Sequence, residues 1–118
     1  MNKTFSYLVI IMIAVCIVSS CSKSTNGGGF SVDCNTVSNK AFAADVNPII
    51  QSSCTPSGCH NTGSGNGPGP LTNYTEVFNA RSSIESAVSS GRMPKNSSLS
   101  TSQKNSIICW IQSGAPNN

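Results

Sequence analysis

A short segment, residues 54–60 with the sequence CTPSGCH, concentrates the side chains of this chain that are best suited to chemistry. Two thiols followed directly by an imidazole can hold haem, because each thiol adds to a vinyl group and the imidazole binds the iron. The usual motif has two residues between its cysteines, whereas four residues separate Cys54 from Cys59. His60 is the single histidine of the chain and therefore its only imidazole.

A second chemical candidate lies at Met93-Pro94. Proline fixes its own backbone and favours an extended conformation in the residue before it, so the thioether sits on a stiff segment. Such a thioether is suited to bind haem iron opposite an imidazole, and His/Met ligation raises the reduction potential. Two alternatives stay open for the second ligand: a lysine such as Lys95, or no side chain at all. A single methionine can also simply fill a gap in a core.

The first twenty residues have the features of a secretion signal. Lys3 precedes a nearly continuous apolar run over residues 5–18, which is too short to span a membrane. Ser19 and Ser20 stand directly before Cys21 and resemble the lipobox of bacterial lipoproteins, which implies cleavage before Cys21 and a lipid on its sulfur. The sequence thus predicts a signal peptide over residues 1–20 and a lipoprotein of the cell envelope, anchored to a membrane and facing the periplasm or the cell surface. Ordinary secretion with cleavage nearby and an uncleaved anchor are the alternatives.

Composition limits the rest of the chain to one small domain. The 118 residues suit a single domain, and residues 21–31 are rich in Ser and Gly, as expected of a flexible tether. The predicted domain therefore covers residues 32–118. Charged residues make up only 9% of the chain and the net charge is +3, without a basic stripe. Nucleic acid is therefore not an expected partner.

The spacing of apolar residues predicts helices. One helix should end at Cys54, with Asp45 or Asn47 as its cap and Pro48 in its first turn. One or two helices are expected from Asn73 to Ser89, before a stop at Gly91. The clearest helix covers residues 101–113, where Ser100 and Gln103 have capping-box spacing. Residues 61–70, with four glycines and two prolines, predict a loop that could lie over a flat cofactor.

Taken together, these segments resemble a known family. The stretches that carry the resemblance are VNPII at 46–50, Cys59-His60, LTNY at 71–74, MPK at 93–95 and WIQSGAP at 110–116. In this order they look like the small cytochrome c-like domains of lipoproteins from Gram-negative bacteria, over roughly residues 33–118. The resemblance implies an all-α fold of three to four short helices around one covalently bound haem c, with a long Gly/Pro-rich loop.

The same resemblance implies roles for individual residues. Cys54 and Cys59 would carry the thioethers, and His60 and Met93 would be the iron ligands. The implied function is that of a carrier of single electrons between redox partner proteins. An enzyme is not expected, because no nucleophile–base pair stands out and Met93 would leave no open position on the iron. The four-residue spacing departs from the usual motif, although longer spacings occur in some multihaem cytochromes.

Two further cysteines, Cys34 and Cys109, lie in or near the terminal helices. Terminal helices pack together in a cytochrome c-like fold, so the resemblance implies a disulfide between these residues. The alternative is a buried Cys109 thiol and a free Cys34.

Two other classes of function remain open at this stage. In one, Cys54, Cys59 and His60 bind Zn or Cu instead of haem. In the other, the chain is a structural surface lipoprotein without haem, stapled by the disulfides Cys54–Cys59 and Cys34–Cys109.

Overall fold

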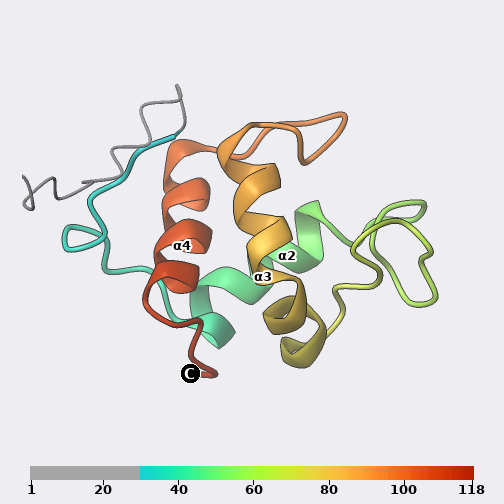
Figure 1. Cartoon of the computed structure of the whole chain (residues 1–118), viewed down its shortest axis with the longest axis horizontal. Coiled ribbons are helices and arrows are strands. Elements are labelled where there is room, and N and C mark those ends of the chain that lie inside the picture. The colour runs from blue at the N-terminus through green and yellow to red at the C-terminus, as the bar shows by residue number, and fades with distance from the viewer. Residues whose placement is uncertain (1–29) are drawn as a thin grey trace, which may run out of the picture.

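The computed structural model describes residues 30–118, which form an all-α domain without strands, as predicted. Its helical elements are η1 (Phe42–Val46), α2 (Asn47–Ser53), α3 (Tyr74–Ser89) and α4 (Thr101–Gln112) (Figure 1). None of the helices in this range is both long and apolar enough to cross a membrane. The predicted signal peptide, the lipidation candidate Cys21 and residues 21–29 of the predicted tether lie outside the described residues.

The first helical segment begins at Phe42, before both residues that were expected to cap it, Asp45 and Asn47. A π-helical turn, η1, precedes α2, and the amide of Val46 accordingly donates to the carbonyl of Ala41 five residues back. Asp45 caps this earlier start, because its carboxylate accepts from the Ala41 amide at 2.9 Å. The prediction that Asn47 could cap the helix is wrong, since Val46 holds the N-cap position of α2 without a side-chain hydrogen bond. Pro48 lies in the first turn of α2, as expected.

The two longer helices begin at side-chain caps. Asn73 accepts from the Glu76 amide at the start of α3. Glu76 does not complete a capping box there, because its carboxylate instead accepts from the amide and hydroxyl of Thr72. At the start of α4, Ser100 and Gln103 form the predicted capping box in both directions. Since a capping box satisfies two amides that the helix leaves free, it fixes the start of α4.

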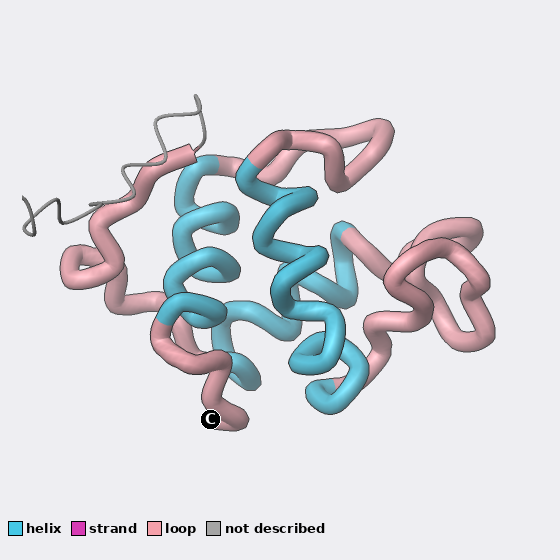
Figure 2. The backbone as a smooth tube through the Cα atoms, in the orientation of Figure 1, coloured by secondary structure: helices cyan, strands magenta, loops and turns pink. Residues whose placement is uncertain are grey.

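Helices α3 and α4 lie side by side, and η1 packs against α4 while α2 extends behind α3 (Figures 1 and 2). The residues predicted to form apolar stripes meet between these elements, and the largest fully buried side chain is Trp110. The buried cluster comprises Phe42, Val46, Ile50, Leu71, Val77, Ala80, Ile84, Val88, Leu99, Ile107, Ile108, Trp110 and Ala115.

Aromatic rings join the first helical turn to α3 and α4. The ring of Phe42 lies 5.0 Å from that of Tyr74 and 5.2 Å from that of Trp110, measured between centroids. The polar groups of Trp110 and Tyr74 both have hydrogen-bond partners. The Trp110 indole donates to the Pro116 carbonyl and the Tyr74 hydroxyl donates to the Ala115 carbonyl, each at 2.9 Å. The residues after α4 are thereby fastened to the core, as buried Tyr and Trp groups require.

The N-terminal part of the described chain is joined to α4. The Sγ atoms of Cys34 and Cys109 are 2.02 Å apart, so the predicted pair lies at disulfide distance. Phe30 and Val32 are half-buried against the core.

Candidate functional site

The loop from Cys54 to His60 closes on itself. Cys54 caps the C-terminus of α2, where its amide donates to the Ile50 carbonyl. At the other end of the loop, the His60 amide donates to the Cys54 carbonyl at 2.9 Å. Gly58 has φ +82°, in the left-handed region that favours glycine, which lets the chain turn before Cys59. The backbone that carries the two thiols and the imidazole therefore forms a closed loop despite the longer spacing, and all three residues line one pocket.

The imidazole of His60 is held in one orientation. The side chain is buried, with 7% of its surface exposed, and Nδ1 lies 2.9 Å from the Gly69 carbonyl oxygen. A carbonyl oxygen can only accept a hydrogen bond, so the Nδ1 atom carries the proton and Nε2 of the neutral ring keeps a lone pair. This is the arrangement in which a backbone carbonyl orients a metal-binding histidine.

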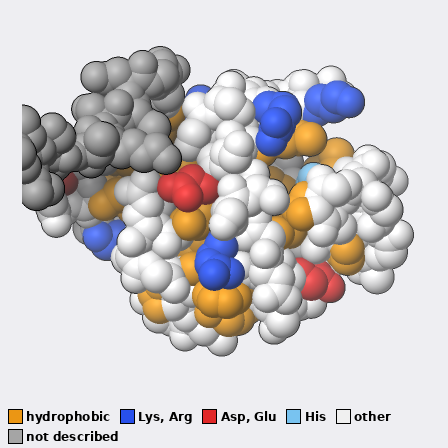
Figure 3. Space-filling model, in the orientation of Figure 1, with side chains coloured by type: hydrophobic (Ala, Val, Ile, Leu, Met, Phe, Trp, Pro, Cys, Tyr) orange, Lys and Arg blue, Asp and Glu red, His pale blue; other side chains and the backbone are white. Residues whose placement is uncertain are grey.

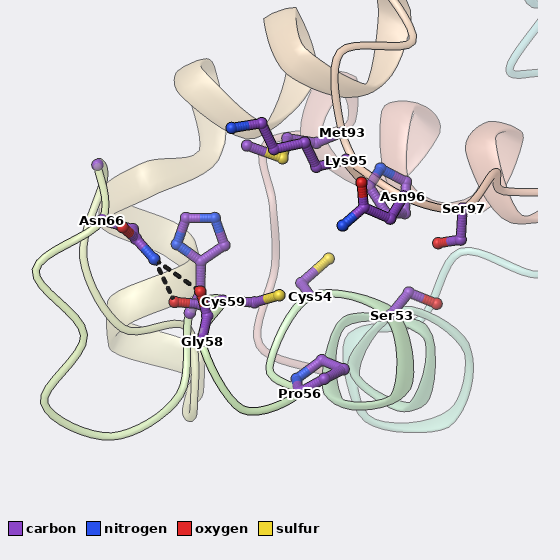
Figure 4. A pocket seen from close by; sticks show the side chains of 13 residues that line it. Ser53, Cys54, Pro56, Gly58, Cys59, Asn66, Met93, Lys95, Asn96 and Ser97 are labelled. Carbon is purple, nitrogen blue, oxygen red and sulfur yellow. Dashed lines mark hydrogen bonds between the residues drawn. The ribbon is translucent and has the colours of Figure 1, made fainter.

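The Gly/Pro-rich loop braces this side of the site. Leu71, which is buried, donates its amide to the His60 carbonyl at 2.9 Å. The Asn66 side chain donates to the carbonyls of Gly58 and Cys59, both at 3.0 Å (Figure 4). The loop over residues 61–70 thus returns to the cysteine segment and fixes it from outside.

Met93 reaches the site from the end of α3. Gly91, with φ +70°, turns the chain after the helix. The Met93 amide then donates to the Ala87 carbonyl at 3.2 Å, which ties the start of the Met-Pro segment to the last turn of α3. Met93 and Pro94 are half-buried, whereas residues 95–98 are exposed.

These segments enclose a pocket of about 550 Å³. All four residues predicted from the sequence to bind a cofactor line it: Cys54, Cys59, His60 and Met93. The cysteine sulfurs lie on one side of the space, and Met93 and Lys95 lie on the side facing them (Figure 4). The other lining residues are Ser53, Pro56, Gly58, Asn66, Gly67, Pro94, Asn96 and Ser97.

The two thiols differ in their surroundings. Cys59 is exposed, whereas Cys54 is half-buried and packs against the core cluster. Burial, together with the neighbouring Cys59, raises the pKa of the Cys54 thiol to about 11. Cys54 and Cys59 are not joined to each other, so the structure does not contain the Cys54–Cys59 disulfide of the scaffold alternative.

The arrangement also bears on the alternative with Zn or Cu. Within residues 30–118, no three side chains of His, Cys, Asp or Glu lie close enough to hold one metal ion. Cys54, Cys59 and His60 therefore line one cavity without converging on one point. A group that spans the cavity can meet them separately.

Sequence reasoning missed several contributors to the site. The Gly69 carbonyl orients His60, but a backbone carbonyl leaves no signal in residue types. Asn66 lies within a polar loop where many asparagines would look the same. Asn96 and Ser97 could have been found, because they directly follow the Met-Pro-Lys segment.

Comparison of the chain with protein-family models, with curated proteins and with solved structures gives no match. We therefore infer function from the residues of the pocket.

Proposed function

We propose that the domain is a c-type cytochrome that carries single electrons, with haem c attached through Cys54 and Cys59 and ligated by His60 and Met93. One observation supports this above all. Four residues that have the chemistry for covalent attachment and axial ligation, spread along the chain from α2 to the segment after α3, line the same pocket.

The pocket fits such a group in size and in donor set. Its volume of about 550 Å³ falls in the range of roughly 300–1,000 Å³ that is typical of ligand pockets. Because His60 Nδ1 is hydrogen-bonded to the Gly69 carbonyl, the lone pair of Nε2 is left for a metal. Both cysteines are unpaired and therefore available for attachment.

Haem, when bound, supplies a one-electron ferric/ferrous couple whose potential His/Met ligation raises. The chain supplies position and environment. His60 is oriented by Gly69, and the two cysteines are held by the loop that His60 closes onto Cys54. Met93 lies on the facing wall, and if both His60 and Met93 held the iron, no position would remain for a substrate. Electron transfer, and not catalysis, is therefore the proposed activity, with a redox protein as the partner.

The proposed setting is the cell envelope. The Ser19-Ser20-Cys21 segment supports a lipid anchor on Cys21, which would place the domain beside a membrane. Cys21→Ser should then release the domain into the soluble fraction or stall its processing. Unchanged cleavage and membrane association in this variant would exclude the lipid anchor.

The test of the central proposal is a mass and a spectrum. The chain should be co-expressed with a haem-attachment system, and its intact mass should then include one haem. A pyridine haemochrome spectrum of wild type should show a haem with two thioether bonds. Cys54→Ala or Cys59→Ala should leave a single thioether bond and thereby shift the reduced α-band to the red. Wild-type protein without the haem mass under these conditions would refute the proposal, and a Cys54–Cys59 disulfide in that protein would favour the scaffold alternative.

A further inference from the structure

Lys95 is the charged residue of the pocket lining, and no Asp or Glu contributes to that lining. Its side chain runs beside Met93 on the wall that faces the cysteines (Figure 4). Figure 3 shows basic and apolar side chains near the histidine on this face, with the acidic side chains farther away. The opening of the pocket therefore has a positive charge.

The carboxylates of the domain are already engaged elsewhere. Asp33 and Asp45 accept from the amides of Asn35 and Ala41, Glu76 accepts from Thr72, and Glu85 accepts from the Gln112 amide. Their locations follow from these contacts: the loop before η1, the start of η1, the start of α3 and the side of α3 next to α4. None of these four carboxylates is placed to neutralise Lys95.

Three other cations of the domain have partners inside it. The Lys40 amine donates to the Cys34 carbonyl at 2.8 Å, and the Arg81 guanidinium donates to the Phe78 carbonyl at 2.7 Å. The Lys104 amine lies 5.9 Å from the centre of the Phe30 ring. Within residues 30–118, neither Lys95 nor Arg92 has a comparable partner, and of these two only Lys95 lines the cavity.

A haem that occupies this pocket brings two propionate carboxylates with it. We propose that Lys95 binds one of these carboxylates. The inference rests on the proposed function and adds a residue that orients the haem and neutralises charge at its edge. An ammonium group suits this role because a carboxylate gains both a hydrogen bond and charge compensation from it.

The test separates the carboxylate from the rest of the haem. In a Cys54→Ala/Cys59→Ala chain, haem binds without covalent attachment and can be compared with haem dimethyl ester, in which both carboxylates are blocked. We expect Lys95→Gln to weaken haem binding by on the order of fivefold, the size typical of a partly exposed charge pair. Binding of the ester should not change, because the ester carries no negative charge.

Two further variants complete the design. Lys95→Arg should retain haem affinity because it keeps the charge. Lys104→Gln removes a cation outside the pocket and should leave both affinities unchanged. Equal loss of haem and ester in Lys95→Gln, or no loss of either, would overturn the role of Lys95 while leaving the proposed function intact. If no variant bound haem and wild type carried no covalently attached haem, the proposed function itself would be overturned.

The attached form gives a second measurement if the double variant does not fold. Removing the positive charge next to a carboxylate should favour ferric iron, so the potential of Lys95→Gln should fall below those of wild type, Lys95→Arg and Lys104→Gln. Equal potentials in all four proteins would contradict the proposed contact.

Discussion

The two walls of the pocket are built very differently. On the His60 side, backbone and side-chain hydrogen bonds tie the cysteine loop to itself and to residues 61–71. On the Met93 side, a single backbone hydrogen bond, from the Met93 amide to the Ala87 carbonyl, holds the start of the segment over residues 93–99. The buried side chain of Leu99 anchors its end. Residues 95–98 between them are exposed. The difference indicates that the first wall is formed before a ligand arrives, whereas the second can adjust to it.

The largest effect on haem content is expected from a change on the His60 side of the pocket. His60→Ala removes the imidazole that the surrounding bonds orient, and we expect more than about a tenfold loss of haem-containing protein, in line with the importance of oriented metal ligands. Haem content per chain, measured by the pyridine haemochrome, tests this. Lys104→Gln is the control, since it lies outside the pocket. Normal haem content and an unchanged spectrum in His60→Ala would contradict the assignment of the axial ligand.

The next effect concerns the fold that carries both walls. Cys34 and Cys109 are separated by 75 residues, and the chain-entropy model values such a crosslink at roughly 4 kcal/mol. Replacing both cysteines by serine should lower the free energy of unfolding in urea by about that amount. Thiol titration of the denatured, unreduced protein provides the independent check. Two extra free thiols in wild type would show that the disulfide does not form.

On the Met93 side of the pocket, Met93→Ala should leave the covalent attachment of haem intact but change the reduction potential and the spectrum of the iron. The methionine thioether favours ferrous iron, so its loss should lower the potential by on the order of a hundred millivolts, a fraction of the range that axial ligands span. A weak charge-transfer band at the red edge of the ferric spectrum should disappear as well. A wild-type protein that lacks this band and has high-spin ferric iron would show that Met93 is not a ligand.

The buried thiol predicts a pH effect in the haem-free protein. The folded state keeps the Cys54 proton up to about pH 11, while the unfolded chain loses it at lower pH. The folded state thus binds more protons in this interval, and its stability should fall as the pH rises from about 9 to 11, by roughly 2 kcal/mol. Unfolding curves of wild type and Cys54→Ala across this interval measure the difference, because other titrating groups are common to both. Parallel profiles would argue against a buried thiol.

The smallest effect compares two asparagines on opposite walls. Asn66 donates two hydrogen bonds to the cysteine loop, so Asn66→Ala should cost about 1 kcal/mol of stability in the haem-free protein. Asn96 lines the same pocket on the other wall but, unlike Asn66, has no side-chain hydrogen bond within the described residues, so Asn96→Ala should leave stability within measurement error. Equal effects of the two changes would remove the distinction between the walls.

Much of this arrangement could be predicted because the signals are local. The Ser100–Gln103 capping box, the cap at Asn73 and the stop at Gly91 each depend on residues within one turn of the helix end. The π-helical turn of η1 could not be predicted in this way. Its bonds depend on where the chain before α2 meets α4, and Asp45 caps it from inside the segment. The grouping of Cys54, Cys59, His60 and Met93 was predicted from their haem-binding chemistry together with the family resemblance, because spacing alone does not say where a loop returns.

The Cys34–Cys109 bond has a mechanical consequence. Every residue of the pocket lies between these two cysteines in the sequence, within the segment that the bond closes. Tension applied before Cys34, as the proposed lipid anchor at Cys21 would apply it, would enter α4 through the sulfur atoms. The loops that hold His60 and Met93 would then carry little of that load, and drag on the domain would not pull the pocket open.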